Sequence, residues 1–446
     1  MSETNWPVFW QRSAEAPRRR PDSSVESGWP GRWGPRDRSG QNSPDPAIIP
    51  IERRRGNAAH LKIGIVSLQP EEWDSLWRPA HFVELGLARR FPVVWVDPAR
   101  EWREVLRPGP AGLRFRRPVP ERALDVYTPP RHLPRLYRPD ALRRTLERAR
   151  LGQAVERLRR QGCERIVLYA WRPDCLERVD LVAHDLLVYH VIDEYSYAPD
   201  DPPTPERERR MIRRADQVIL HSPGLVEKKG GIAPEKTAFV PNGVPFSRFA
   251  ADAPEPPELR GIPRPRIGYV GAFKRQMDWT IVRNLVAGHP EWHWVFVGEW
   301  LESHTDLAPV RSWLEARPNV HFAGCVPADR LGEFPFHFDV GVLPYVEDGY
   351  TKYIYPLKLH EYLAAGLPAV GTPIRTLRDF AGEIRLARTA GEWEAAIEAA
   401  LGPEQRSPEA VTRRRAVAKA HDWDRLVDGI AEMIEDRLAR KLAATD

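Results

Sequence analysis

Several features that would indicate other protein classes are missing from this sequence. Its 446 residues include only three cysteines, Cys163, Cys175 and Cys325, with no CxxC spacing and no cluster of histidines beside them. Such cysteines predict reduced structural thiols in a cytoplasmic protein, and they argue against a disulfide framework or a zinc site. No GxGxxG follows a predicted strand, so the main signal of an NAD-type dinucleotide fold is absent.

Long apolar segments are also missing. Charged residues make up 29% of the chain, the mean hydropathy is −0.50, and no apolar run approaches the roughly 18 residues of a membrane span. Residues 1–21 contain no apolar h-region, so we expect no secretory signal there. The net charge of +5 is small for this length, and we expect no nucleic-acid partner.

The remaining pattern predicts an α/β protein with two similar halves. Residues 1–60 are rich in proline, arginine, serine and glycine without a repeat, which predicts a disordered tail. From LKIGIVSL (61–68) onward, buried strands alternate with amphipathic helices such as those at 78–90 and 140–160. This alternation implies parallel sheets with right-handed crossovers.

A proline-dense segment at 251–265 separates the first βα series from a second one. In the second series we predict helices at 278–287, 309–316, 327–332, 357–365 and 391–401. We therefore expect two Rossmann-like domains that face a central cleft. The predicted boundaries are a disordered tail at 1–60, an N-terminal domain at 61–245, a linker at 246–265, a C-terminal domain at 266–420 and a final helix at 421–446 that crosses back to the N-terminal domain.

The stretch around the helix at 357–365 carries the clearest chemical signal. Pro356 suits a first helical residue and Gly366 a C-terminal stop, so the helix is short and needs packing to be stable. Lys358 and Glu361, three residues apart, are expected on an exposed flank near the helix N-terminus. That end of a helix favours phosphate, and a carboxylate one turn on can accept two hydrogen bonds from a diol such as a ribose. The alternative is an ordinary surface salt bridge.

Several motifs in order resemble the GT-B glycosyltransferases, specifically the retaining, family-4-like group. They are VPNGVPFSRF (240–249), RIGYVGAF (266–273), NVHFAGCVPADRL (319–331), FDVGVLPY (338–345) and PLKLHEYLAAGLPAVGTP (356–373). Each motif alone is weak, and the ordered set is specific. The resemblance covers about residue 61 to the C-terminus. It implies a GT-B fold and a hexosyl-type transferase that takes a sugar from a nucleoside-diphosphate sugar, with retention, and needs no cofactor beyond that donor.

The resemblance assigns roles to several residues of the second series. Glu361 is expected to bind the ribose, while Lys358 and the loop residues Lys274 and Arg275 stabilise the leaving diphosphate. Gly271 directly follows a strand, and a glycine there lets the backbone approach a pyrophosphate. Further donor-site candidates lie at strand ends and in the loop before the helix: Glu299, Tyr345, Tyr350, Thr351 and Leu357.

The first series supplies candidates for the acceptor side. Asp193 and Glu194 follow a predicted strand at its carboxyl end, where open α/β sheets bind ligands, although each could equally be a turn or cap carboxylate. Four residues near the first βα loop also border the expected acceptor region: Ser67, Trp77, Arg78 and His81. For these the alternative is helix capping and ordinary surface.

One departure from the family pattern leaves other functions open. The family often carries a second glutamate eight residues before the ribose-binding one, and here that position is Tyr353. This favours one of two alternatives. The chain belongs to a branch of the family in which the contact of the missing glutamate is replaced, or it is a non-catalytic, glycosyltransferase-like binding protein. A sugar-nucleotide epimerase on the same architecture is a further alternative.

Two other patterns have competing explanations. Asp422 and Asp424 spell a DxD, which holds a divalent metal in a different glycosyltransferase class, but here the pair opens the final helix and N-capping explains it better. We therefore predict no metal site. The helix at 140–160 is basic and amphipathic, so it predicts either a cover for the sheet with solvated arginines or a peripheral contact with an anionic membrane at its cytoplasmic face. The acceptor is expected to be a glycan or a lipid-linked glycan.

Overall fold

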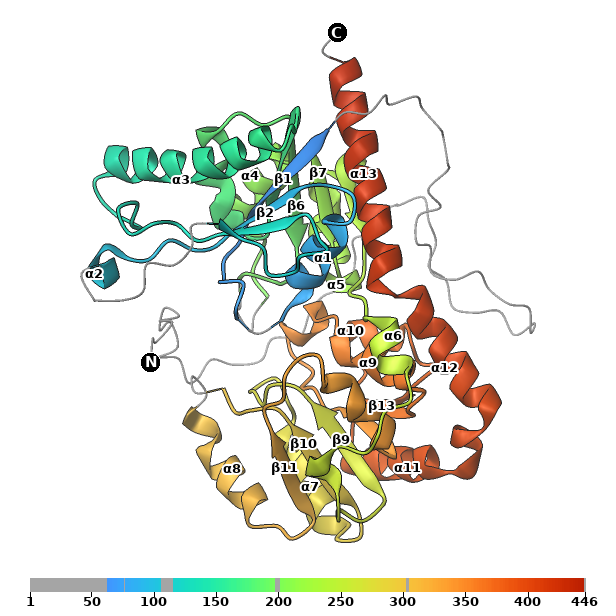
Figure 1. Cartoon of the computed structure of the whole chain (residues 1–446). Coiled ribbons are helices and arrows are strands. Elements are labelled where there is room, and N and C mark those ends of the chain that lie inside the picture. Colours follow the sequence, from blue (N-terminus) through green and yellow to red (C-terminus); the bar gives the residue numbers. More distant parts are fainter. Residues whose placement is uncertain (1–61, 76, 106–114, 197–200, 302–304, 445–446) are drawn as a thin grey trace, which may run out of the picture. The chain divides into compact units, whose positions relative to one another are not determined.

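The computed structural model describes residues 62–444 except 76, 106–114, 197–200 and 302–304. The predicted tail at 1–60 lies outside these residues. Two β-sheets follow one another along the described chain, and helices alternate with their strands (Figure 1). The predicted class, α/β with largely parallel sheets, is confirmed.

The described part of the first sheet has the strand order β3-β4-β2-β1-β5-β6-β7-β8, in which β3 pairs antiparallel with β4 and the other pairs are parallel. The strands are β1 (Ile63–Leu68), β2 (Val93–Val96), β3 (Phe115–Arg116), β4 (Leu124–Tyr127), β5 (Arg165–Ala170), β6 (Leu186–Val191), β7 (Gln217–Leu220) and β8 (Thr237–Phe239). The order reverses between β1 and β5. Ligands of open α/β sheets bind at the carboxyl ends of strands beside such a reversal.

The second sheet is parallel throughout its described strands, in the order β11-β10-β9-β12-β13-β14. The strands are β9 (Arg266–Val270), β10 (His293–Val297), β11 (Val320–Gly324), β12 (Val340–Leu343), β13 (Ala369–Gly371) and β14 (Arg385–Leu386). Here the order reverses between β9 and β12. The residues that follow these two strands therefore stand where a ligand is expected.

Helices follow most strands in both series. Those of the first series are α1 (Pro79–Leu87), α2 (Trp102–Val105), α3 (Asp140–Arg160), α4 (Glu206–Arg214), α5 (Pro223–Lys229) and α6 (Phe246–Ala250). Those of the second are α7 (Trp279–Gly288), α8 (Ala308–Glu315), α9 (Leu357–Ala365), α10 (Arg375–Arg378), α11 (Ala390–Leu401), α12 (Pro408–Ala420) and α13 (Trp423–Ala443). None of the helices in the described part of the chain is long and apolar enough to cross a membrane.

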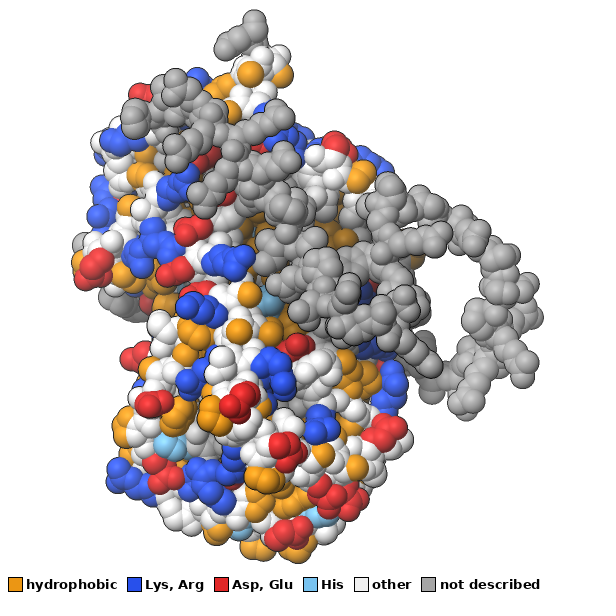
Figure 2. Space-filling view, turned by 90° about the vertical axis from the view of Figure 1, so that its right-hand side faces the viewer, with side chains coloured by type: hydrophobic (Ala, Val, Ile, Leu, Met, Phe, Trp, Pro, Cys, Tyr) orange, Lys and Arg blue, Asp and Glu red, His pale blue; other side chains and the backbone are white. Residues whose placement is uncertain are grey.

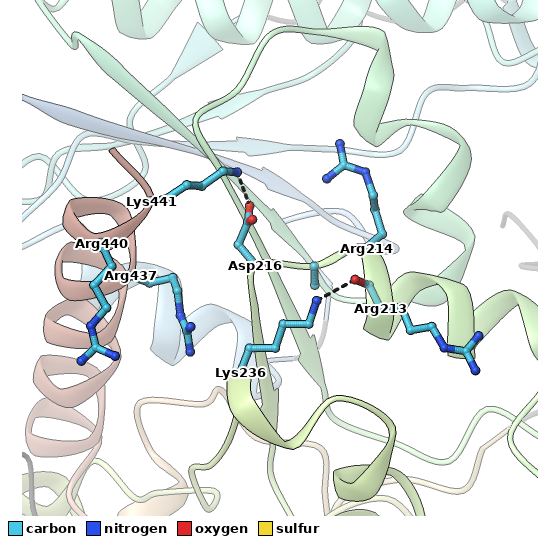
Figure 3. A pocket seen from close by; sticks show the side chains of 8 residues that line it. Arg213, Arg214, Asp216, Lys236, Arg437, Arg440 and Lys441 are labelled. Atoms are coloured by element: carbon cyan, nitrogen blue, oxygen red, sulfur yellow. Dashed lines mark hydrogen bonds and ion pairs between the residues drawn. The ribbon is translucent and has the colours of Figure 1, made fainter. Parts of the chain in front are cut away.

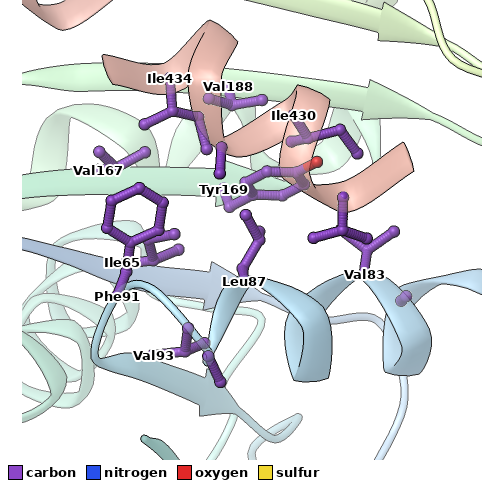
Figure 4. Close-up of a cluster of buried hydrophobic side chains, with 14 of the residues drawn as sticks. Ile65, Val83, Leu87, Phe91, Val93, Val167, Tyr169, Val188, Ile430 and Ile434 are labelled. Atoms are coloured by element: carbon purple, nitrogen blue, oxygen red, sulfur yellow. The ribbon is translucent and has the colours of Figure 1, made fainter. Parts of the chain in front are cut away.

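The last helix, α13, packs on the first sheet although it follows the second sheet in sequence. Its apolar stripe, Leu426, Ile430, Ile434 and Leu438, is buried. This stripe belongs to one hydrophobic cluster with residues of β1, β5, β6 and α1 (Figure 4). Burial of such a stripe is the main stabilisation available to an amphipathic helix, so α13 fastens the end of the chain to the first half.

Two local predictions need correction. The helix expected at 327–332 is absent, and a single 3₁₀ turn, η7 (Leu331–Glu333), stands near its end. The segment is too short to stabilise an α-helix by itself. In α3 the buried apolar residues are Leu151, Ala154 and Leu158, whereas Leu142 is 47% exposed. Only the second half of that helix therefore covers the sheet.

Candidate active site

The candidate site is built around the carboxyl ends of β9 and β12, beginning with Gly271. This residue directly follows β9 and has φ of +129°, a conformation that residues with side chains rarely adopt. A Cβ at Gly271 would lie 2.6 Å from Cε and Nζ of Lys358, and one at Gly298 would lie 2.4 Å from the Gly271 carbonyl oxygen. Glycine at both positions therefore allows the lysine and two loops to meet.

Helix α9 positions Lys358 and Glu361 beside this loop. Pro356 is its N-cap, not its first residue, and Gly366 ends it as predicted. The Lys358 Nζ atom lies 4.9 Å from the centroid of the Tyr269 ring. The two side chains are half-buried, not exposed as expected, because they face Tyr269 of β9 and not open solvent.

Glu361 has the electrostatics of a ligand-binding carboxyl group. Burial raises its pKa to about 7, although the Lys358 ammonium lowers it. Among the described residues, none forms a hydrogen bond with its carboxylate oxygens or with the Lys358 ammonium. Two polar groups that are partly buried and lack such partners are costly unless a ligand supplies them.

Lys274 joins this group from the loop after β9. Burial and, second to it, the positive charge of Lys358 lower its pKa to about 8, and Asp193 opposes the shift. The nearby charges include Arg78 at the start of α1. The loop thus brings Lys274 into the electrostatic range of Lys358 and of two candidates from the first half.

The tyrosines before α9 connect the same region. Tyr345 lies two residues after the end of β12 and is buried, and burial raises its pKa above the usual range. The Tyr350 hydroxyl donates a hydrogen bond to Oδ2 of Asp193 at 3.2 Å, which links the loop before α9 to the loop after β6. Thr351 is buried and donates to the Val346 carbonyl at 2.6 Å, so its side chain holds this loop together.

Three other donor-site candidates are placed differently. Arg275 is exposed and forms a bidentate pair with Asp306, with nitrogen to oxygen distances of 2.7 to 2.9 Å. Glu299 is exposed, and its carbonyl accepts a hydrogen bond from the Phe273 N–H at 2.8 Å. Leu357 packs against the hydrophobic cluster that α13 forms with β1, β5, β6 and α1. The structure therefore groups Lys274, not its neighbour Arg275, with Lys358.

Glu194 lies in a buried ion network and not in an open loop. It is 2% exposed, and its Oε2 lies 3.2 Å from Lys229 and 3.4 Å from Lys228. Lys229 also pairs with Glu208 at 2.6 Å. Burial raises the pKa of Glu194, but Lys229 and hydrogen bonds from Ser196 outweigh it and lower the pKa. These contacts give Glu194 a structural role beside the site.

Tyr353, which stands where the family often has a glutamate, is bound to the first half. Its hydroxyl donates to Oδ1 of Asp201 at 2.6 Å, and Lys228 pairs with the same carboxylate at 2.7 Å. Lys352 is a third partner of Asp201. Burial raises the pKa of Asp201, but these hydrogen bonds outweigh it and lower the pKa to about 2. Tyr353 is therefore part of an ionic contact between the loop before α9 and the first half.

The acceptor-side candidates divide into buried and exposed groups. Ser67 is fully buried and donates to Glu84 of α1, and His81 is buried with ring contacts to Trp73 and Trp77. Trp77 is 36% exposed and stacks on His81 with a centroid distance of 5.5 Å. Arg78 is exposed and pairs with Glu71 at 2.8 Å. Trp77 and Arg78 are thus the exposed members of this set.

Sequence reasoning missed Glu84. It is fully buried on the face of α1 that packs on the sheet, and the Trp171 indole N–H donates to its Oε1 at 3.0 Å. Burial raises its pKa to about 7, although hydrogen bonds from Ser67 and Trp171 lower it. The sequence signal was available, because a glutamate next to Val83 and three residues before Leu87 stands on an apolar helix face.

The two aspartates of the DxD pattern lie at the start of α13, and both side chains make contacts there. Asp422 is its N-cap, and its side chain accepts from the Asp424 N–H at 3.3 Å. Asp424 pairs with Arg89. Among the described residues there is no group of three or more His, Cys, Asp or Glu side chains that could hold a metal ion. The N-cap interpretation of Asp422 is confirmed.

Comparisons with known proteins agree with this architecture. Residues 264–402 match the family model described as "Glycosyl transferases group 1". A curated relative in Bacillus subtilis (strain 168), named "Putative teichuronic acid biosynthesis glycosyltransferase TuaH", is 30% identical over 227 residues, which are 49% of this chain. The match spans 56% of that relative, so the chain covers little more than half of its length.

Solved structures share the fold at low sequence identity. Sucrose-phosphate synthase from Thermosynechococcus elongatus has a TM-score of 0.62 and 15% identity over 86% of this chain and 100% of that one. The Anabaena protein HepE, in complex with UDP and glucose, has a TM-score of 0.56 and 17% identity over 84% of this chain and 99% of that one. The GT-B fold that the sequence motifs implied is thus confirmed, as is the likeness to glycosyltransferases over residues 264–402. The chain has the GT-B fold, and its residues 264–402 are similar to the glycosyl transferases group 1 family.

Proposed function

We propose that this protein is a glycosyltransferase that moves a sugar from a nucleoside-diphosphate sugar to a glycan or lipid-linked glycan acceptor. The observation that carries the proposal is the pair Lys358 and Glu361. Both are half-buried beside Gly271, and neither forms a hydrogen bond with a described residue. A nucleotide sugar supplies what each lacks, a phosphate for the lysine and a ribose diol for the carboxylate.

The charges around Gly271 suit a departing diphosphate. Lys358, Lys274 and the N-terminus of α9 supply positive charge at one point, and preorganised charge of this kind stabilises the transition state without reorganisation. Because burial lowers the pKa of Lys274 to about 8, an arriving diphosphate would also raise that pKa and favour the ammonium form. In this mechanism the residues do the work of a divalent metal.

The acceptor would lie against the first half, where Trp77 and Arg78 are exposed near the carboxyl end of β1. An aromatic ring can cover the apolar face of a sugar, and Arg78 lies within the electrostatic environment of Lys274. The curated relative is named for teichuronic acid biosynthesis, which supports a polysaccharide acceptor. The Anabaena protein HepE was solved in complex with UDP and glucose, which supports a UDP-linked hexose donor.

Peripheral membrane contact through α3 has less support. Its buried residues Leu151, Ala154 and Leu158 pack in the core, and Arg150 is buried against the carbonyls of Leu133 and Pro134. The helix therefore serves mainly to cover the sheet. A lipid-linked acceptor remains compatible with a weaker surface contact.

The deciding experiment incubates the protein with a panel of labelled nucleoside-diphosphate sugars and measures sugar release, with and without glycan acceptors. One donor should be consumed faster than the others, and Lys358→Ala should slow its consumption by about 10²-fold or more. Binding of a donor without turnover in any acceptor mixture would instead indicate a non-catalytic binding protein. A changed sugar configuration in the recovered nucleotide would indicate an epimerase.

A further inference from the structure

A second polar site lies on the first sheet, at the opposite edge from the carboxyl ends. A pocket of about 410 Å³ opens where Asp216 precedes β7 and Lys236 precedes β8. Because β7 and β8 are parallel, these residues share the amino edge of the sheet. The pocket is therefore separate from the candidate active site, which uses carboxyl ends.

The lining of this pocket is strongly basic. Six cations and a single carboxylate, that of Asp216, line it (Figure 3). The cations come from α4, from the segment before β8 and from α13: Arg213, Arg214, Lys236, Arg437, Arg440 and Lys441. On the face shown in Figure 2, by contrast, basic and acidic side chains are interspersed. The chain's net charge of +5 does not by itself produce such a local excess.

Two of the cations have only neutral partners. Lys236 Nζ donates to the Arg213 carbonyl at 2.6 Å, and Arg437 donates to Oε1 of Gln217 at 3.2 and 3.3 Å and to the Glu235 carbonyl at 3.2 Å. Within the described part of the chain, no carboxylate lies within ion-pair distance of either. Burial lowers the pKa of Lys236, and the charges of Glu235 and Asp216 oppose this shift more strongly than those of Arg437 and Arg214 add to it. An anion in the pocket would give Lys236 and Arg437 a countercharge within contact distance.

The other cations are paired in ways that a stronger anion can displace. Arg213, Arg214 and Arg440 pair with exposed carboxylates of Glu206, Asp180 and Asp436 outside the lining. Exposed pairs of this kind contribute little to stability. Lys441 holds Asp216 at 2.8 Å, and the same oxygen accepts from the Leu187 N–H, so the carboxylate is fixed to the backbone.

The ends of α4 and α13 explain part of the basic composition, since cations stabilise the C-terminus of a helix. They do not explain Lys236, which lies in neither helix and donates across to the end of α4 (Figure 3). Cations of three separate segments thus line one pocket. Arginine forks and lysine ammonium groups in this arrangement match the tetrahedral oxygens of phosphate.

We propose that this pocket is a binding site for a phosphate group that carries more than one negative charge, distinct from the donor site. Lys236 and Arg437 are its central contacts, and the surrounding arginines add to the field. The phosphate can come from a free small molecule or from the headgroup of an anionic lipid. Both sources would occupy the same contacts without blocking the carboxyl edge of the sheets.

The test measures binding of inorganic pyrophosphate by calorimetry at low salt. The comparison is made in full-length Lys358→Ala protein, which removes the phosphate contact proposed at the donor site. Adding Lys236→Gln and Arg437→Gln should weaken binding by about tenfold or more, since two charge-assisted contacts are lost. The matched control, Arg160→Gln with Arg311→Gln, removes two exposed arginines elsewhere and should leave the affinity unchanged.

Two further measurements keep the result interpretable. Arg440→Gln alone changes an exposed side chain, so it should fold normally and weaken pyrophosphate binding by a smaller factor. Sedimentation with neutral and phosphatidylglycerol vesicles separates the sources. Vesicle binding that the double substitution removes supports a lipid headgroup, and pyrophosphate binding alone supports a free phosphate. Equal pyrophosphate affinity in the proteins with and without the pocket substitutions, or no binding in either, would overturn the proposal.

Discussion

The polar residues at the carboxyl edges of the two sheets differ in how far the protein itself satisfies them. At the second sheet, Lys358 and Glu361 form no hydrogen bond with any described residue, although both are half-buried. At the first sheet, Ser67, Oε1 of Glu84 and the carboxylate of Glu194 all have partners within the fold. Residues of the same chemical types thus stabilise the structure in one half and stay available to a ligand in the other.

This comparison teaches that position at a strand end is not sufficient evidence for a binding role. Glu194 follows β6 at its carboxyl end, yet Lys229 and Ser196 occupy its oxygens. Glu361 lies on a helix, yet its carboxylate keeps its hydrogen-bonding capacity. Substitutions in the two halves should therefore affect different properties, stability in the first and ligand binding or turnover in the second.

The largest effect is expected for Lys229→Met in the first half. Lys229 is buried and lies 3.2 Å from Glu194 and 2.6 Å from Glu208, so its loss leaves buried Glu208 without a countercharge and Glu194 with the more distant Lys228 alone. Breaking a buried pair in this way costs about 3–5 kcal/mol of unfolding free energy. Urea denaturation measures it, with exposed Lys419→Met as the control. A loss below about 1 kcal/mol would show that the network is not structural.

In the second half, Lys358→Ala should act on turnover instead. Loss of a preorganised cation at the departing diphosphate should lower kcat by about 10²-fold or more. Arg275→Gln is the matched control, because its guanidinium is held by Asp306 and its loss should change kcat much less. Steady-state kinetics with the preferred donor gives both values. Equal losses in the two variants would mean that the loop after β9 rearranges when the donor binds.

Glu361→Ala should weaken binding of the preferred nucleoside diphosphate by about 1.5–3 kcal/mol, since two hydrogen bonds to a charged acceptor are lost. Because the pKa of Glu361 is raised to about 7, only the ionised form that grows as pH rises through this value can accept from both hydroxyls. Calorimetry should therefore show affinity increasing from about pH 6 to about pH 8. Glu361→Gln should reduce the affinity less and remove this pH dependence. Unchanged affinity in the alanine variant would eliminate the ribose assignment.

The position of the candidate donor site on α9 could be predicted because residues close together in the sequence define it. Helix α9 was placed with correct bounds, since Pro356 and Gly366 mark its ends and the motif fixes its residues. The spacing of Lys358 and Glu361 then follows from helix geometry. Helix α3 also has the predicted bounds, 140–160.

Long-range contacts account for what the sequence could not give. Lys274 and Arg275 are neighbours of similar charge, and only the position of Asp306 on the far side of the loop decides which of them joins Lys358. The partners of Tyr353 and Glu194 likewise come from other segments, Asp201 and Lys229. The apolar face of α1 signals that Glu84 is buried, but its hydrogen bond from Trp171 could be derived only with the sheet order known.

A smaller effect, on the pH dependence of stability, is expected for Glu84→Gln. Burial raises the pKa of Glu84 to about 7 in the folded protein, while in the unfolded chain it keeps its ordinary value near 4.5. The folded state therefore binds the proton more tightly, and this residue's contribution to stability falls as pH rises toward and through 7. Between about pH 5 and about pH 8 the fall should be about 1–3 kcal/mol.

Urea denaturation of the wild-type protein and Glu84→Gln at both pH values isolates this contribution by difference, because Glu361 titrates alike in both proteins. The variant should lose less stability on raising the pH, and nucleotide affinity should not change. If the free energy of unfolding changes equally with pH in the two proteins, the ionisation of Glu84 costs no more in the folded state than in the unfolded chain.

The last expectation is an absence of effect, and it tests whether the second half needs a metal to do what its residues can do. If Lys358, Lys274 and the N-terminus of α9 carry the diphosphate charge, turnover should be the same in EDTA as in magnesium-saturated EDTA, the ionic control. Asp422 and Asp424 are engaged by the start of α13 and by Arg89, so recruiting them as metal ligands would disrupt a helix cap. Activity that chelation abolishes and manganese restores would contradict the charge assignment. In that case a metal ion, and not Lys358 and Lys274, would neutralise most of the charge of the departing diphosphate.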